Sequence, residues 1–145
     1  MDILVSGSMA YDRIMDFEGK FSDHILPDQL DNINVSFTVN SLTENFGGTA
    51  GNIAYSLSLL GEKPRILATI GQDYHRYFEW LERIGVPTGD IRVVEEELTA
   101  GAYITSDTQN NQITGFNPGA MKQQSGFDFE TVDPKDCLAI VAPGN

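Results

Sequence analysis

Three short, almost purely apolar runs constrain most strongly what this chain can fold into. They lie at residues 3–5, 64–71 and 138–142. Apolar runs of this length, without a regular polar alternation, are typical of parallel strands that are buried on both faces. Patterns of helical period follow the second run and lie between it and the first. The chain therefore predicts an α/β fold built on a buried parallel sheet.

The two helices expected beside this sheet are marked by their glycines as well as by their apolar spacing. Residues 49–60 carry apolar side chains at positions 53, 54, 57 and 60, and Gly61 follows. Residues 74–84 show the same kind of spacing, and Gly85 follows. A glycine just after the last turn is a common C-terminal cap, so both helices are expected to end there.

A second group of strands has a different pattern and predicts an antiparallel unit. In residues 32–40 apolar and polar side chains alternate, as in a strand with one wet face. Residues 91–94 are expected to form another short strand, and residues 101–105 and 112–116 two more around a polar hairpin loop at 106–111. The sequence thus combines a buried parallel sheet with antiparallel strands.

The acidic composition restricts the partners. The 145 residues suffice for one core, and their 21 acidic and 9 basic side chains give a formal net charge of −12. Such a chain repels phosphate backbones and anionic lipid surfaces, so neither nucleic acid nor a membrane is expected as a partner. Its first residues lack a basic region and a long apolar stretch, which predicts a cytoplasmic protein without a signal peptide or anchor.

The residues that most often carry metal or thiol chemistry are few. Cys137 is the only cysteine and is followed by an apolar run, which predicts a small buried side chain rather than a reactive thiol. His24 and His75 are far apart and are expected on the surface. No spacing suggests shared metal ligands, so no metal site is expected.

The glycine-rich segment 47–52 (GGTAGN) is the sharpest local feature. Glycines before a helix let backbone N–H groups approach a ligand closely, and the helix N-terminus favours a polar or anionic group. The spacing matches neither a Walker loop nor a dinucleotide-binding fingerprint. A tight turn that feeds a closely packed helix is the alternative explanation, and both remain open on the residues alone.

Asp12 is a second candidate site residue. It is expected in the loop 7–12 after the first strand, at the carboxyl edge of the sheet, where its carboxylate could accept hydrogen bonds from the hydroxyls of a ligand. A solvated turn residue is the alternative.

Taken in order, these features resemble the ribokinase-like (PfkB) family of sugar and nucleoside kinases. The resemblance covers essentially the whole chain: Gly-Ser and Asp12 after the first strand, the glycine pair and asparagine of segment 47–52, the stretch 70–73 (IGQD), and residues 99–119 as returning strands. It implies the N-terminal part of a doubly wound, Rossmann-like ribokinase fold with an inserted antiparallel β lid. The lid segments are expected at about 13–46 and 98–119.

The resemblance also implies roles for particular residues. Asp12 and Asn52 would hydrogen-bond substrate hydroxyls, and Gly47 and Gly48 would form the hinge of the lid and bring the backbone to the substrate. The family further implies ATP and Mg²⁺. Two apolar lid residues are candidates for covering the substrate, and a core role is equally open for both: Phe37 and Phe116.

The same family implies an acceptor. The stretches 24–28, 46–55 and 111–120 resemble bacterial and archaeal adenosine or nucleoside kinase-like members, so an adenosine-like nucleoside, phosphorylated on its hydroxymethyl group, is the first expectation. A sugar such as ribose or fructose is the second.

The chain departs from the family in one respect. The family's catalytic aspartate lies in a Gly-Ala-Gly-Asp motif, and no such motif occurs in the 145 residues. We therefore expect the N-terminal portion of one kinase domain, without a catalytic residue, without the ATP-binding part, and inactive alone. The alternatives are a non-catalytic binding or dimerisation module, joined as a homodimer through its lid strands, and a truncated product without function.

Overall fold

The computed structural model describes residues 1–144, with side chains for all of these except residues 28, 29 and 32. Asn145, the expected end of a kinase fragment, lies outside the described residues. The elements follow one another as β1 (Asp2–Ser6), β2 (Ala10–Asp16), η1 (Phe21–Asp23), η2 (Pro27–Asn32), β3 (Ser41–Gly47), α1 (Thr49–Leu59), β4 (Arg65–Leu67), β5 (Thr69–Gly71), α2 (His75–Arg83), β6 (Arg92–Val94), β7 (Ala100–Ser106), β8 (Gln112–Asn117), η3 (Gly119–Lys122), η4 (Phe129–Thr131) and β9 (Cys137–Val141).

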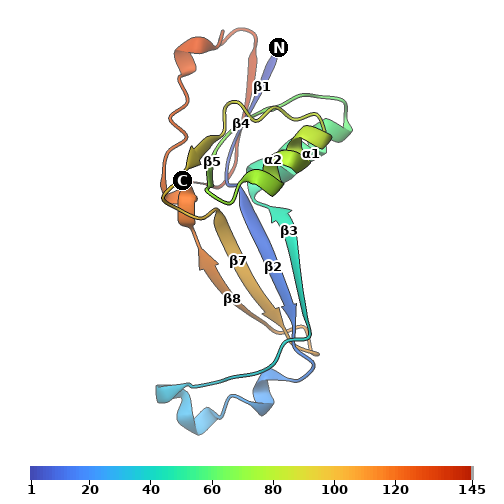
Figure 1. Ribbon diagram of the computed structural model, residues 1–145, viewed down its shortest axis with the longest axis vertical. Coiled ribbons are helices and arrows are strands. Elements are labelled where there is room, and N and C mark those ends of the chain that lie inside the picture. Colours follow the sequence, from blue (N-terminus) through green and yellow to red (C-terminus); the bar gives the residue numbers. More distant parts are fainter. Residues whose placement is uncertain (145) are drawn as a thin grey trace. The chain divides into compact units, whose positions relative to one another are not determined.

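The chain divides into two compact units (Figure 1). We call residues 1–11, 46–101 and those from 117 on the core unit, and residues 12–45 and 102–116 the inserted unit. The boundaries fall inside strands β2, β3, β7 and β8, so each of these strands contributes residues to both units.

Two small parallel sheets form the centre of the core unit. In the first, β1 lies between β4 and β9 and is parallel to both, with Val5 opposite Ile66 and Ile140. In the second, β5 is parallel to β6, so the strand expected at 91–94 is present but belongs to this parallel sheet and not to the antiparallel unit. The expected α/β class and the buried character of the first two apolar runs are confirmed, because Val5, Ile66 and Ile70 are completely buried.

The second apolar run differs from the single strand expected at 64–71. It divides at Ala68 into β4, which pairs with β1, and β5, which pairs with β6. Every residue from 66 to 71 is buried, so the run is apolar because both short strands lie in the core. An apolar run reports burial but not the neighbour with which each residue pairs, which is why the division could not be seen in the sequence.

The helices α1 and α2 lie where they were expected, and both glycine caps are confirmed. Gly61 and Gly85 have φ values of 85° and 75°, the left-handed conformation that ends a helix at little cost for glycine. The helix α1 packs on β1 and β4. Ala54, from α1, and Tyr77 and Leu81, from α2, are completely buried in the core of this unit.

The strand β9 is parallel to β1, as predicted, but it is not buried as predicted. Leu138 is 47% exposed and Val141 is 82% exposed, although Ile140 packs against the core. The strand β9 lies next to β1 on the side away from β4, whereas the helix α1 packs on β1 and β4. Cys137, at the start of β9, is half-buried rather than buried.

The inserted unit is built mainly on one sheet, in which the strands follow the order β3-β2-β7-β8. Figure 1 shows β3 antiparallel to β2 and β8 antiparallel to β7, while β2 and β7 run in the same direction. Arg13 on β2 links the first three strands, because its guanidinium donates to Glu44 Oε2 at 2.9 Å and to Tyr103 Oη at 3.2 Å. The expected antiparallel strand pairs are therefore present, and the central pair is parallel.

The strand expected at 32–40 is wrong. Residues 33–39 form neither helix nor strand, and the strand that pairs with β2 is β3, beginning at Ser41. The alternation is still visible in the burial of side chains 35, 37 and 39. At position 37 this burial comes from aromatic packing, since the Phe37 ring lies 4.7 Å from that of Phe17 and 5.5 Å from that of Phe21.

The hairpin loop between β7 and β8 is organised by Asp107. This buried carboxylate accepts hydrogen bonds from the backbone N–H groups of Phe21, Gln109 and Asn111 and from the side chain of Asn111. Burial alone would raise the pKa of Asp107, but the hydrogen bonds from Asn111, Phe21 and Gln109 outweigh it and lower the pKa to about 2. The ionised carboxylate therefore holds the loop to residue 21.

A pH dependence of stability follows from this lowered pKa. Because the pKa of Asp107 is lower in the folded than in the unfolded chain, its contribution is complete above about pH 4 and is lost as the pH falls towards 2. We expect the urea midpoint to decrease over this range, and to decrease less in Asp107→Asn, which should already be less stable at pH 7. Asp23→Asn, at an exposed position, is the matched control. If Asp107→Asn had the same urea midpoint as the parent at pH 7, and the midpoint fell equally steeply between about pH 4 and pH 2, Asp107 would not be the source of this pH dependence.

Candidate functional site

The glycine-rich segment 47–52 connects β3 to α1 within the core unit, and its second glycine has to be a glycine. Gly48 has φ 90° and ψ 148°, a conformation that residues with a side chain rarely adopt. A Cβ atom there would lie 2.5 Å from the Ser8 carbonyl oxygen and 2.7 Å from the Met9 Cα. The backbone after β1 and the start of α1 therefore approach each other more closely than any other residue would permit.

The first turn of α1 is capped by Ser8, which follows β1. The Thr49 N–H donates to Ser8 Oγ and the Ser8 N–H donates to Thr49 Oγ1, both at 3.0 Å. The Ala50 N–H donates to the Ser8 carbonyl oxygen at 2.9 Å. The N–H groups of Thr49 and Ala50 are thus already satisfied by the protein, so this geometry supports the close-packing explanation of the segment over an amide cradle at those two positions.

The same network reaches the end of β9. Thr49 Oγ1 donates to the Pro143 carbonyl oxygen at 2.6 Å, and the Ser8 N–H lies 3.1 Å from that oxygen. Three segments that follow β1, β3 and β9 therefore meet at the N-terminus of α1. They meet at the carboxyl end of the parallel sheet, the edge at which open α/β sheets bind their ligands.

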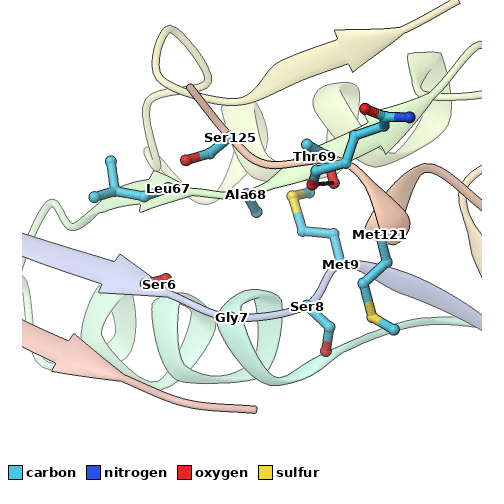
Figure 2. A pocket seen from close by; sticks show the side chains of 10 residues that line it. Ser6, Gly7, Ser8, Met9, Leu67, Ala68, Thr69, Met121 and Ser125 are labelled. Atoms are coloured by element: carbon cyan, nitrogen blue, oxygen red, sulfur yellow. Dashed lines mark hydrogen bonds between the residues drawn. The ribbon is translucent and has the colours of Figure 1, made fainter. Parts of the chain in front are cut away.

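A small cavity lies beside this network in the core unit (Figure 2). Its volume is about 30 Å³, which suits a water molecule rather than a nucleoside or sugar. The lining comes from the end of β1 and the loop after it, from the end of β4 and the start of β5, and from η3 and the chain after it: Ser6, Gly7, Ser8, Met9, Leu67, Ala68, Thr69, Met121, Gln123 and Ser125. Hydroxyl groups and main-chain atoms thus dominate this end of the sheet.

The structure assigns the predicted site residues to different surroundings. In the core unit, Gly47 is buried, and Asn52 is exposed in the first turn of α1 with no side-chain hydrogen bond to any residue between 1 and 144. In the inserted unit, Asp12 is half-buried inside strand β2. The expected loop position of Asp12 is therefore wrong, because the loop after β1 is only three residues long and β2 begins at Ala10.

The two candidate lid phenylalanines also differ from each other. Phe37 is half-buried in the aromatic group with Phe17 and Phe21, which supports the core role that the sequence left open. Phe116, on β8, is 54% exposed. His24 and His75 are exposed, as expected, and no group of potential metal ligands occurs within residues 1–144.

The stretch 70–73 has a clear structural role that sequence reasoning did not find. Asp73 Oδ1 accepts hydrogen bonds from the Thr99 N–H at 2.8 Å and from Thr99 Oγ1 at 2.6 Å, and the Gly71 N–H donates to Thr99 Oγ1 at 3.0 Å. The Tyr11 hydroxyl donates to the Asp73 carbonyl oxygen at 2.9 Å. Asp73 therefore fixes the chain just before β7. No local pattern connects residues 73 and 99, so only the motif itself could have drawn attention to them.

Ser8 and Tyr77 are further residues of this region that the sequence did not single out for a role. Serine is a common capping residue, but the helix that Ser8 caps begins 41 positions later, so no local pattern revealed this cap. The Tyr77 hydroxyl donates to the Gly47 carbonyl oxygen at 2.7 Å. The apolar spacing of residues 74–84 indicated only that Tyr77 lies in the core.

Comparison with known proteins identifies the family. The model of the pfkB family of carbohydrate kinases matches residues 2–141, so this chain belongs to the pfkB family. A nucleoside kinase from Methanocaldococcus jannaschii is 34% identical over 91 residues, which make up 61% of this chain and 30% of that protein.

Solved structures agree with this assignment and confirm the ribokinase-like fold. The ligand-free nucleoside kinase of Burkholderia thailandensis is 48% identical, with a TM-score of 0.79 over 98% of this chain and 47% of that one. Its complexes with inosine and with ADP-inosine give 44% and 47% identity and TM-scores of 0.75 and 0.68, each over 98% of this chain and 44% of that one. Ribokinase from Cryptococcus neoformans in complex with ADP is 26% identical, with a TM-score of 0.67 over 83% of this chain and 35% of that one. This chain thus spans less than half the length of these relatives.

No helix among residues 1–144 has the length and apolar character needed to cross a membrane.

Proposed function

We propose that this chain supplies the acceptor-binding and lid part of an ATP-dependent nucleoside kinase that phosphorylates the hydroxymethyl group of an adenosine-like nucleoside. The observation that carries the proposal is that this chain is more similar in sequence to a nucleoside kinase than to a ribokinase. Identity is 44% to 48% with a nucleoside kinase that binds inosine and 26% with a ribokinase, and the first match covers more of the chain. The cytoplasmic location expected from the sequence stays a prediction.

The proposed binding residues have side chains suited to a polyhydroxylated acceptor. Asp12 offers carboxylate oxygens that accept hydrogen bonds, and the exposed amide of Asn52 can both donate and accept. Gly47 and Gly48 would bring main-chain atoms to the acceptor and let the lid move at the end of β3. The exposed Phe116 is suited to cover a base, whereas Phe37 is the weaker candidate because its ring is occupied by Phe17 and Phe21.

These residues bind and orient an acceptor but do not activate it. When bound, ATP and Mg²⁺ would supply the phosphoryl group and the charge that stabilises its transfer. In-line transfer also needs a base at the acceptor hydroxyl and amides that stabilise the developing charge, and the sequence holds no Gly-Ala-Gly-Asp motif to provide them. We therefore propose that the 145-residue chain binds nucleoside without phosphorylating it.

A second candidate function rests on the edge of the inserted sheet. Every residue of β8 is exposed, and it is an edge strand whose side chains include Ile113 at 47% and Phe116 at 54% exposure. Exposed apolar edge strands are available for pairing with another chain. A binding or dimerisation module, in which two copies pair through the lid strands, is therefore the alternative to a kinase part.

The test measures binding and transfer separately. Inosine, adenosine and ribose are titrated into the 145-residue chain by calorimetry, and the protein as its native cell makes it is assayed for phosphate transfer from ATP with Mg²⁺. We expect the nucleosides to bind more tightly than ribose, transfer to a nucleoside by the native protein, and no transfer by the 145-residue chain.

The other outcomes decide between the alternatives. Tighter binding of ribose, with transfer to it, would replace the nucleoside with a sugar. A native protein of 15.9 kDa that forms dimers, binds neither class of acceptor and transfers no phosphate would establish the dimerisation module. Aggregation of the chain, with no binding, would favour the truncated product.

A further inference from the structure

The core unit contains a buried hydroxyl that neither the fold nor the proposed function explains. Tyr77, on α2, is completely buried, and its hydroxyl donates to the carbonyl oxygen of Gly47 at 2.7 Å. Its ring lies 5.1 Å from that of Phe46 and 5.7 Å from that of Tyr11. Phenylalanine would fill the same space, so the hydroxyl itself requires a reason.

Gly51 is the one glycine of the segment 47–52 to which the proposed function gives no role. Its backbone is ordinary helix, so it does not need glycine for its conformation. A Cβ atom at this position would instead overlap the Tyr77 hydroxyl oxygen. The glycine therefore makes room in α1 for the one polar atom that Tyr77 carries.

The hydrogen bond from Tyr77 fixes more than one atom of the backbone. The peptide group between Gly47 and Gly48 is planar and trans, so its C=O and N–H point in opposite directions. Holding the carbonyl oxygen of Gly47 against Tyr77 also sets the direction of the Gly48 N–H. Two consecutive glycines would otherwise leave this peptide group the freest in the segment.

We propose that Tyr77 is a positioning residue for acceptor binding, which orients the Gly47–Gly48 peptide group through its hydroxyl, and that Gly51 serves to admit that hydroxyl. The inference rests on the proposed function, in which these two glycines bring the main chain to a nucleoside. It adds two residues to the binding apparatus that touch no ligand themselves. It also explains the third glycine of the segment.

The first experiment removes only the hydroxyl. In the native protein, Tyr77→Phe should raise the KM for inosine about tenfold, as expected for the loss of one buried hydrogen bond, while the KM for ATP stays within about twofold. Tyr74→Phe is the matched control, because the Tyr74 hydroxyl has no hydrogen-bond partner among residues 1–144. It should leave both constants unchanged.

A second variant separates positioning from general loss of stability. Leu81 is completely buried on the same helix and has no hydroxyl that could donate to Gly47, so Leu81→Val should lower the urea midpoint without a selective effect on inosine. Equal rises in the KM for inosine in Tyr77→Phe and Leu81→Val would show that stability alone is responsible. That result would overturn the positioning role.

The pairing of Tyr77 with Gly51 is tested by a double-mutant cycle. Gly51→Ala should raise the KM for inosine in the parent, because the new methyl group displaces the hydroxyl, and should raise it much less in the Tyr77→Phe background, where that atom is gone. Fully additive effects would contradict the pairing.

If the parent protein binds no nucleoside, the proposed function fails and this inference with it. If the parent binds inosine and the single variants bind it equally well, only this inference fails.

Discussion

Replacing Gly48 with alanine should lower the free energy of unfolding by about 2–5 kcal/mol, a large effect for a single methyl group. Part of the loss comes from the backbone, because φ 90° with ψ 148° is strained for alanine. The rest comes from space, because the new Cβ atom would lie 2.5 Å from the Ser8 carbonyl oxygen and 2.8 Å from the Ala10 nitrogen. Urea unfolding, monitored by circular dichroism, measures the total loss in free energy of unfolding from strain and overlap together.

Two other glycines separate these contributions. Gly61 has nearly the same φ, 85°, but no atom within 4 Å of a Cβ placed on it, so Gly61→Ala should cost only about 1 kcal/mol from strain. Gly115 has open space and no positive φ, so Gly115→Ala should be close to neutral. If Gly48→Ala lowered the free energy of unfolding no more than Gly61→Ala, the backbone at Ser8 would not lie as close to Gly48 as the structure shows.

The sequence predicted best those elements whose signals are local. The apolar spacing and the terminal glycines of α1 and α2 define each helix from its own residues, and both helices were found. The strands β1, β6, β7 and β8 were also expected close to their observed positions. In each case the pattern depends on burial and turn residues within about ten positions of the element.

The sequence failed where the identity of the neighbour decides the outcome. Residues 33–39 alternate like a strand, yet the position beside β2 is taken by β3, whose own pattern is weak because only Gly47 of its seven residues is buried. Val141 is apolar but 82% exposed, on a strand that lies beside the two strands on which α1 packs. Alternation and apolarity describe which side chains face inward, not which backbone pairs with which.

The candidate site shows the same limit. The segment 47–52 was recognised from its glycines, but the reasons for them are contacts with residues 8 and 77, which lie far away in the chain. The capping of Thr49 and Ala50 by Ser8 could not be read from spacing either, and it turns an apparent anion cradle into a packing junction. Motif recognition thus located the segment, and the structure explained how it is built.

Removal of the Asp12 carboxylate should have the largest effect on acceptor binding. If Asp12 accepts hydrogen bonds from the hydroxyls of a nucleoside, Asp12→Ala should weaken binding by about 1–3 kcal/mol, or roughly 5- to 150-fold. The side chain is half-buried on β2. Asp12→Asn keeps one acceptor oxygen but loses the charge, so its effect should be intermediate. Calorimetry with inosine, and the KM for inosine in the native protein, measure the change.

The control for Asp12 is another carboxylate of the inserted unit. Glu18 is exposed, so Glu18→Ala changes the net charge by the same amount without removing the proposed contact. A general effect of charge on nucleoside binding would appear in both variants, whereas a direct hydrogen bond would appear only in Asp12→Ala. An Asp12→Ala protein that folds and has an unchanged KM for inosine and unchanged turnover would remove Asp12 from the binding site. The acceptor would then have to be held by Asn52 and the main chain of the glycine pair.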